Sequence, residues 1–339
     1  MSSKGNRVVS ITTAIAVLAI AIGGAIWIKH RAPADQSKPA VGRQGESESA
    51  NTDPPLVPRP SNAPLPPLDQ PLAASLSDLS KRAKQGDPAA ACRLAAEYAH
   101  CSELNYMRSE TERWLSDRQR AIDLISDPKT KASAAEGIER EMAFRDERLA
   151  KIELHCKGVS IPAPTEIAKA WREAALLGNK STMHHYSTGS AFRWNHMMQA
   201  LPELMRYKDE AERIATAAAS KGDVRVTMAL AIAYDPRPTT SKSLLAQTVT
   251  QDGARSLALY ERVGSILDLY PSEEYSTLRR RIATRVTELN EALTPAEIER
   301  AKSITRVELS RWSRPSQGDS NQLDANGVTR DVSAASCGR

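Results

Sequence analysis

The feature that most constrains this chain is an uncharged run of 21 residues near its start. Residues 8–28 read VVSITTAIAVLAIAIGGAIWI, and Trp27, Lys29 and Arg31 form an interfacial edge at their end. At 1.5 Å per residue, a helix of this length spans about 30 Å, the thickness of the hydrocarbon core of a bilayer. The apolar region of a cleaved signal peptide is shorter, about 7–15 residues. The run therefore predicts an uncleaved transmembrane anchor that follows a short leader, residues 1–7.

The orientation of this anchor decides the compartment of the rest of the chain. Basic residues lie on both sides of the run, Lys4 and Arg7 before it and Lys29 and Arg31 after it, so the positive-inside bias is weak. A leader of seven residues before a single first span usually stays in the cytoplasm. We therefore expect a single-pass protein of the inner membrane of a bacterial envelope, with its C-terminal domain in the periplasm. An inverted topology would make that domain a cytoplasm-facing adaptor.

The anchor is followed by a proline-rich stretch, residues 29–72. Ten of the 20 prolines lie in it, and proline removes backbone donors and restricts φ. This composition predicts a disordered linker that holds a folded domain away from the membrane. The sequence PLPP at residues 64–67 also suits an aromatic docking groove. A second disordered segment is predicted at the other end, residues 313–339, which are rich in Ser, Asp, Asn and Gly.

The composition of the remaining chain favours helices. Aromatic residues make up 4% of the sequence, Phe occurs twice, and alternation typical of strands is nearly absent. Helix start signals are frequent: Thr294, Pro295 and Glu297, for example, form a capping box with Pro inside it. These patterns predict that residues 73–312 form an all-α domain.

A pattern of helix, glycine turn, Asp or Asn cap and second helix occurs three times in this domain. Counted from the Asp, the first and third copies place small or apolar residues at +3, +7 and +8 and Tyr at +11, which forms one apolar stripe. The turn residues are Gly86 with Asp87, Gly178 with Asn179, and Gly222 with Asp223. The residues expected to pack the helices together are Leu94, Tyr98, Trp171, Leu230 and Tyr234.

This pattern resembles the Sel1-like repeat, a relative of the tetratricopeptide repeat. That family reads roughly A-x-x-W, then A-A-x-x-G-[DN]-x-x-A-x-x-x-L-G-x-x-Y. Here Trp171 sits one residue closer to the Ala pair, and Ala95 and Ala231 replace the second-helix glycine. The resemblance implies an α-solenoid-like array of helical hairpins that binds proteins, often in envelope or signalling settings, and it does not imply catalysis. An antiparallel helical bundle is the alternative architecture.

The first two copies are separated by an insertion. Residues 103–125 and 132–155 are helical stretches of about equal length, joined by a turn-like break. This arrangement predicts an antiparallel helical hairpin. Cys101 precedes the hairpin and Cys156 follows it, so the two thiols are expected to meet and to form a disulfide if the domain is exported.

The two other cysteines have no predicted partner within the chain. Cys92 lies nine residues before Cys101, on the opposite face of a continuous helix, so those two cannot be bridged. Cys92 would fill the core if it is reduced, and Cys337 is left over in the tail, available for an intermolecular bond or for none. In a cytoplasmic domain all four thiols would be reduced.

Candidate catalytic or metal residues are sparse. His184 and His185 are adjacent and would point about 100° apart on a helix, so they do not chelate as an i, i+4 pair does. We expect them to be partly exposed polar residues beside a repeat turn, and His196 follows ten residues on. The sequence has no H-E-x-x-H, G-x-S-x-G, phosphate-loop or dinucleotide motif. We therefore predict no catalytic residue, cofactor or metal site.

The charge of the chain also bears on function. The net charge is +5 and the sequence pI is about 9.0, which is compatible with nucleic-acid binding. However, residues 1–31 carry four basic and no acidic side chains, and the helical domain is nearly balanced. We therefore expect no nucleic-acid partner. The sequence predicts a membrane-tethered scaffold for an unidentified envelope protein; a cell-wall-acting hydrolase with its site in residues 244–312 is the alternative.

Overall fold

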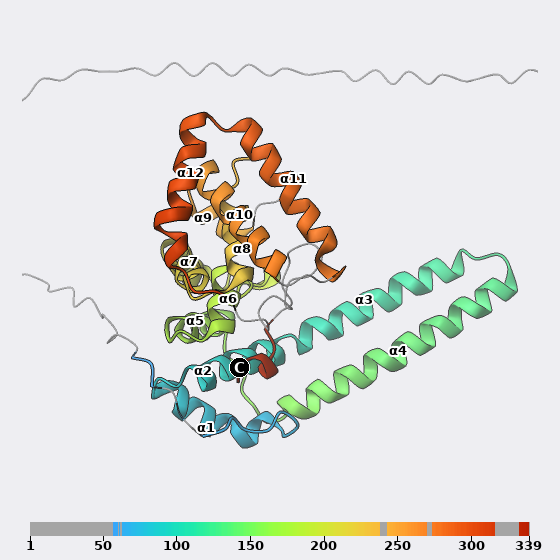
Figure 1. Ribbon diagram of the computed structural model, residues 1–339. Coiled ribbons are helices and arrows are strands. Elements are labelled where there is room, and N and C mark those ends of the chain that lie inside the picture. The colour runs from blue at the N-terminus through green and yellow to red at the C-terminus, as the bar shows by residue number, and fades with distance from the viewer. Residues whose placement is uncertain are drawn as a thin grey trace, which may run out of the picture. The chain divides into compact units, whose positions relative to one another are not determined.

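A computed structural model describes residues 57–59, 61, 63–237, 243–269, 273–315 and 332–338, and this part of the chain is all helical, without strands (Figure 1). All of it belongs to one unit of the chain, Pro54–Arg339. The predicted leader and membrane anchor lie outside the described residues, as do most of the predicted linker and tail. Of the helices that the structure does describe, none combines the length and hydrophobicity needed to cross a bilayer.

The described helices fall into neighbouring pairs along the sequence. Their bounds are α1 Leu72–Lys84, α2 Pro88–Ser102, α3 Leu104–Asp123, α4 Pro128–Cys156, α5 Pro164–Leu176, α6 Lys180–Ser187, α7 Leu201–Ser220, α8 Val224–Tyr234, α9 Leu244–Thr248, α10 Gly253–Leu269, α11 Ser276–Ala292 and α12 Pro295–Val307. Short 3-10 turns are η1 Trp194–His196, η2 Glu273–Tyr275, η3 Leu309–Arg311 and η4 Ala334–Ser336.

The helices pack in a chain of neighbours. α1 contacts α2, α2 contacts α5, α5 contacts α6, α6 contacts α7 and α7 contacts α8. α8 then packs on α10, and α10 carries both α11 and α12. Small residues allow this close approach: alanines of α7 such as Ala211, Ala215 and Ala219 are fully buried, beside larger core side chains such as Trp171 and Leu230.

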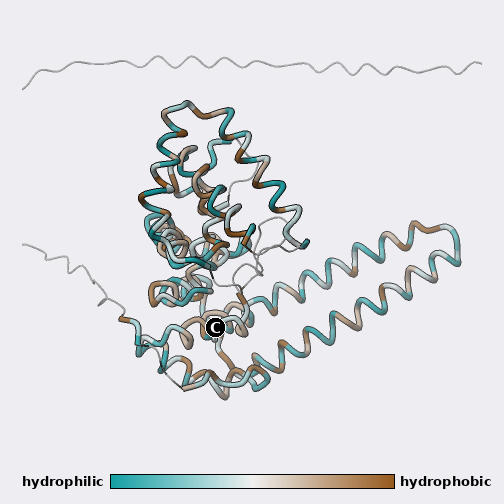
Figure 2. Tube along the Cα trace, viewed as in Figure 1, coloured by the Kyte–Doolittle hydropathy of each residue, from teal (hydrophilic) through white to brown (hydrophobic). Residues whose placement is uncertain are grey.

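The insertion between the first two copies forms the predicted helical hairpin, α3 and α4. Figure 1 shows the two helices side by side, and the colours of Figure 2 show that most of their residues are hydrophilic, with hydrophobic residues interspersed. Asp127 caps α4 by accepting a hydrogen bond from the Thr130 backbone N–H, and Pro128 occupies its first turn. The hairpin meets α1 and α2 at its base.

Three interhelix turns share one local structure. In each, a glycine with positive φ ends a helix and an Asp or Asn side chain caps the next one. The pairs are Gly86 (φ 88°) with Asp87, Gly178 (φ 85°) with Asn179, and Gly222 (φ 89°) with Asp223. The absence of a side chain at Gly222 also allows the backbone of residues 313–315 to pack closely against this turn. The Ser313 N–H donates to the Ser220 carbonyl at 2.8 Å, and a Cβ at Gly222 would lie 2.9 Å from the Arg314 carbonyl oxygen.

Two disulfides join segments of this fold. Cys101 and Cys156 are bonded across the base of the hairpin, with Cα atoms 5.7 Å apart, as the sequence predicts. Cys92 is bonded to Cys337, with Cα atoms 5.5 Å apart, so the prediction that Cys337 is left over and that Cys92 only fills the core is wrong. The reason is tertiary: the chain returns to α2 after 245 residues and places η4 against it.

The described ends of the predicted disordered segments pack on the helices. The Arg82 guanidinium of α1 donates to the carbonyls of Ala63 and Pro64, both at 2.9 Å. The carbonyls of Ser336 and Cys337 accept hydrogen bonds from Ser181 Oγ and Asn179 Nδ2. In both segments, side chains of the helical unit donate hydrogen bonds to backbone carbonyls.

Candidate interaction site

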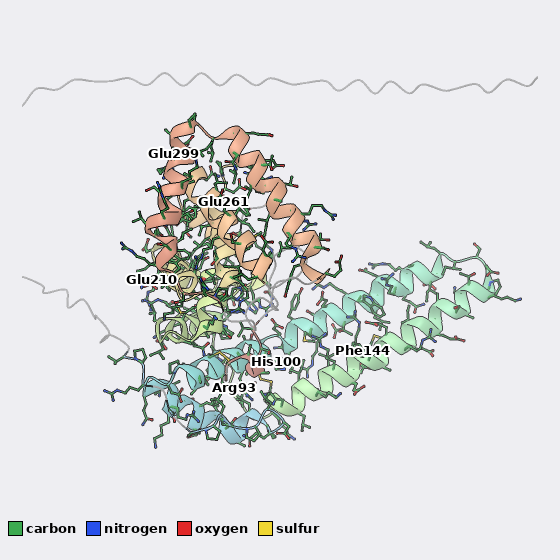
Figure 3. All side chains as sticks on the ribbon, viewed as in Figure 1. Arg93, His100, Phe144, Glu210, Glu261 and Glu299 are labelled. Carbon is green, nitrogen blue, oxygen red and sulfur yellow. A yellow bond between two sulfur atoms is a disulfide. The ribbon has the colours of Figure 1, made fainter. Side chains whose placement is uncertain are left out.

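A cleft of about 660 Å³ lies where the hairpin meets the rest of the unit. The end of α2 contributes Glu103, α3 and α4 form its walls, and the turn around η1 closes one side. We call this space the base cleft. Its aromatic lining residues are Tyr106, Phe144 and Trp194. Figure 3 shows Phe144 on α4.

The aromatic side chains of the base cleft face solvent to an unusual extent. The exposed fractions are 42% for Tyr106, 61% for Phe144 and 87% for Trp194. Met198 follows Trp194 at helical spacing and is 81% exposed. Large exposed apolar side chains grouped around a concavity are typical of protein-binding surfaces, and Trp and Tyr are frequent anchors there.

Charged side chains surround these aromatics. Arg193 forms an ion pair with Glu103, and Arg145 donates to Glu141 at 2.8 Å. The Arg145 guanidinium also lies 4.5 Å from the centroid of the Trp114 ring. The base cleft therefore combines apolar anchors with a rim of partly exposed ion pairs, the composition of a recognition surface.

A second cleft of about 800 Å³ continues from the first. The two share Glu103, Arg148 and Arg193. Trp171 and His185 form part of its lining, and their rings lie 4.1 Å apart between centroids. Residues 332–335 form another part of the lining, and they belong to the C-terminal segment that the Cys92–Cys337 bond joins to α2.

A buried ion network holds the floor of the second cleft. Glu97 accepts hydrogen bonds from Arg93 at 2.6 Å through one oxygen and contacts His155 Nε2 at 2.7 Å through the other. Arg93 and Glu97 side chains are each 3% exposed. Burial lowers the pKa of the neighbouring His100, whose ring packs against that of His155. The network links α2 to α4, and Figure 3 shows Arg93 and His100 on α2.

The structure buries the predicted repeat residues unequally. Trp171, Leu230 and Tyr234 lie in the main core, and Tyr98 is partly buried against it. Leu94 is partly buried against a separate, smaller hydrophobic cluster at the base of the hairpin. The turn residues lie at one end of each helix pair rather than in either cleft. The Asn179 side-chain amide also donates a hydrogen bond to the Cys337 carbonyl of the C-terminal segment.

The two adjacent histidines differ from expectation. His184 and His185 are 1% and 3% exposed, not partly exposed polar residues. Burial lowers the pKa of His184 to about 4 and that of His185 to about 3, with the His184 and Arg193 charges lowering the latter further. The short helix α6 is enclosed on several sides by α5, α7 and α8, which its sequence alone does not reveal. In the part of the chain that the structure describes, no three His, Cys, Asp or Glu side chains gather as potential metal ligands.

A third cleft lies in the region considered for a hydrolase. It has a volume of about 740 Å³ between α10, α11 and α12, and Glu261 and Asp268 both line it. Burial raises the pKa of Glu261, which Figure 3 shows on α10. The two carboxylates come from one helix, seven residues and so about 10 Å of helix axis apart. They do not converge from different elements as an acid and base pair usually does.

The residues that dominate the base cleft were not predicted. Tyr106, Phe144 and Trp194 lie on three different segments, and the signal for one of them is local: Trp194 stands in a polar break between two helices. No family model, curated protein or solved structure matches this chain. The Sel1-like resemblance therefore stays a prediction made from the repeat turns.

Proposed function

We propose that this chain is a membrane-tethered scaffold of a bacterial envelope. Residues 8–28 anchor it in the inner membrane, the proline-rich linker holds the helical unit away from the membrane, and the helical unit binds a partner protein. In this proposal the neighbouring helix pairs form an α-solenoid-like array of the Sel1-like kind. The observation that carries the proposal is the base cleft, where Tyr106, Phe144 and Trp194 are exposed together.

The two disulfides support a periplasmic location for the helical unit. Each bond joins segments far apart in sequence, and such bonds persist in oxidising compartments. A cytoplasm-facing adaptor would keep the same four thiols reduced. The exported orientation is therefore the one that agrees with the chemistry of the fold.

Photo-crosslinking in intact membranes tests this function. A benzophenone amino acid at position 194 is expected to capture a partner protein, and the same probe at Val307 is the control, because Val307 is 56% exposed but lies on α12 away from the base cleft. Capture through position 194 should fall about tenfold when Phe144→Ala removes a neighbouring anchor. Equal capture from both positions, or none from either, would contradict the proposal.

A hydrolase remains the second candidate because Glu261 is a carboxyl with a raised pKa in a cleft. Glu261→Gln would abolish cell-wall digestion by the purified chain if that residue were a general acid. The scaffold proposal expects no digestion by either the native chain or the variant. Turnover by the native chain that the variant loses would favour the hydrolase instead.

A further inference from the structure

The outer half of the α3–α4 hairpin carries a groove of its own. It has a volume of about 560 Å³ and is mainly apolar, with Trp114, Ile125 and Ile138 among its lining residues. Glu141 lines both this groove and the base cleft. The smaller groove and the base cleft therefore lie along one face of the hairpin. We call the two spaces together the hairpin groove.

A subset of the lining positions of the hairpin groove recurs with a seven-residue period. On α3 and the turn that follows it, these positions are Met107, Thr111, Trp114, Arg118, Ala121 and Ile125, at alternating spacings of four and three. On α4 they are Ala134, Ile138, Glu141, Arg145 and Arg148, at the same alternating spacings. A stripe of this period on two neighbouring helices is the surface against which a third helix packs in a coiled coil.

Few residues of the hairpin are buried. In α3 and α4, both fully described, the buried residues are Thr111, Ile122, Ile152 and Cys156. Helices in proteins draw most of their stability from packing of an apolar face, so two helices of 20 and 29 residues would gain from a further partner. A Cβ placed on Gly137, in the floor of the groove, would meet no atom within 4 Å. Space for such a partner is therefore present.

The charges along the groove favour an acidic occupant. Five arginines line it, Arg113, Arg118, Arg145, Arg148 and Arg193, against three glutamates, Glu103, Glu110 and Glu141. Two of the glutamates already pair with arginines of the same surface, Glu103 with Arg193 and Glu141 with Arg145. The excess of arginine complements Asp and Glu on an incoming surface.

We propose that the hairpin groove binds a single amphipathic α-helix of the partner protein, with an apolar stripe flanked by Asp and Glu. α3 and its C-terminal turn offer lining positions from residue 107 to residue 125, which span about 27 Å at 1.5 Å per residue, so the bound helix has about 18 residues. Exposed Phe144 and Trp194 lie at the base end of the groove and anchor that end of the helix. This inference rests on the proposed scaffold function and names the class of partner.

Synthetic peptides test the chemistry of the occupant. A helical peptide of about 18 residues, with Leu at coiled-coil spacing and Glu at the flanks, is titrated into the full-length chain in mild detergent and followed by fluorescence anisotropy. A second peptide has the same Leu stripe with Lys at the flanks. The acidic peptide is expected to bind at least about tenfold more tightly. Equal affinity for the two peptides, or tighter binding of the basic one, would overturn the charge argument.

Variants of the hairpin test the place of binding. Gly137→Leu fills open space in the groove and removes a helical glycine, so it should keep the fold and weaken the acidic peptide at least about tenfold. Ala143→Leu is the matched control, because Ala143 is exposed on the same helix and does not line the groove. The triple change Arg113→Glu, Arg118→Glu and Arg148→Glu should reverse the peptide preference. Unchanged binding by Gly137→Leu would place the peptide elsewhere and overturn the proposal.

The outcomes separate this inference from the scaffold function. Should crosslinking through position 194 capture a partner while neither peptide binds, the scaffold function stands and the helix-in-groove proposal fails. Should both experiments fail, both proposals fail together. The groove could instead be filled by a second copy of the chain, and analytical sedimentation of the full-length chain tests this alternative. A dimer that dissociates in Gly137→Leu would show that a second copy fills the groove, which would also overturn the proposal.

Discussion

A single polar residue in a turn can have two structural roles, and Asp223 is an example. Asp223 is fully buried between α7 and α8, accepts backbone hydrogen bonds from Arg225 and Val226, and pairs with the Arg225 guanidinium at 2.7 Å. One carboxylate therefore caps a helix and balances a buried cation. Removing one member of such a pair leaves the other charge buried and unpaired, which costs more than an exposed pair contributes.

The buried His185 makes stability depend on pH. The unfolded chain binds a proton near the ordinary pKa of 6.5, whereas burial keeps the folded imidazole neutral down to a pKa of about 3. The stability that neutral His185 contributes is complete above about pH 6.5 and is lost as the pH falls toward 3. At pH 5 this loss amounts to about 2 kcal/mol for His185, and His184, whose pKa is about 4, adds a loss of the same sign.

Urea unfolding at pH 7 and pH 5 measures this effect. His185→Phe should keep the ring packing on Trp171 and make the loss of stability between the two pH values about 2 kcal/mol smaller than in the native chain. His196→Phe is the control, because that histidine lies in the η1 turn outside the core. An identical pH dependence in His185→Phe and the native chain would show that this imidazole is protonated in the fold.

At the scale of elements, the C-terminal segment behaves as part of α2. η4 contacts α2, Cys337 is 1% exposed and bonded to Cys92, and polar contacts join the same segment to Asn179 and Ser181. The hairpin is attached in a comparable way, by the Cys101–Cys156 bond and the Glu97 network. A covalent bond thus secures both the C-terminal segment and the hairpin.

Removing the tail bond should release the segment without unfolding the helices. In Cys337→Ser, residues 332–338 are expected to lose their protection against amide hydrogen exchange, while α7 and α8 keep theirs. The free energy of unfolding should fall by about 2–4 kcal/mol. Cys101→Ser is the comparison, and it should increase exchange at the base of α3 and α4 instead. Protection of residues 332–338 that survives in Cys337→Ser would show that Asn179 and Ser181 hold the segment unaided.

At the scale of the whole molecule, compartment and covalent structure are coupled. The predicted anchor places the helical unit on one side of the membrane, and the disulfides require the oxidising side. The long proline-rich linker would let the hairpin groove reach a partner at a distance from the bilayer. In the proposed topology, the orientation of the anchor and the formation of both disulfides depend on each other.

Thiol trapping measures membrane orientation and covalent structure together: cells are quenched with acid, their proteins are denatured, and free thiols are then labelled. A maleimide reagent of high mass should leave the native chain unmodified and add four labels after reduction, because Cys92, Cys101, Cys156 and Cys337 are all bonded. A chain lacking residues 1–28 should stay in the cytoplasm and take up label without reduction. Four reactive thiols in the membrane-bound native chain would show the inverted, cytoplasm-facing orientation.

The parts of the fold that sequence reasoning anticipated are local in origin. The capping box at Thr294 and Glu297 begins α12, and the hairpin is formed by helices at Leu104–Asp123 and Pro128–Cys156, close to the predicted stretches. Prolines, capping side chains and helical periodicity act within a few residues, so they can be read along the chain. The Cys101–Cys156 bond could be predicted for the same reason, since a hairpin brings its own ends together.

The parts that escaped prediction depend on segments distant in sequence. The pairing of Cys92 with Cys337 joins residues 245 positions apart, and the burial of His185 depends on α5, α7 and α8 surrounding one short helix. The base cleft likewise forms only when α2, the hairpin and the turn at Trp194 meet. Backbone preferences and hydrophobic periodicity specify where helices begin, end and turn. Which faces meet, and which apolar residues stay exposed, follow from packing among remote elements, and this packing creates the surface proposed to bind a partner.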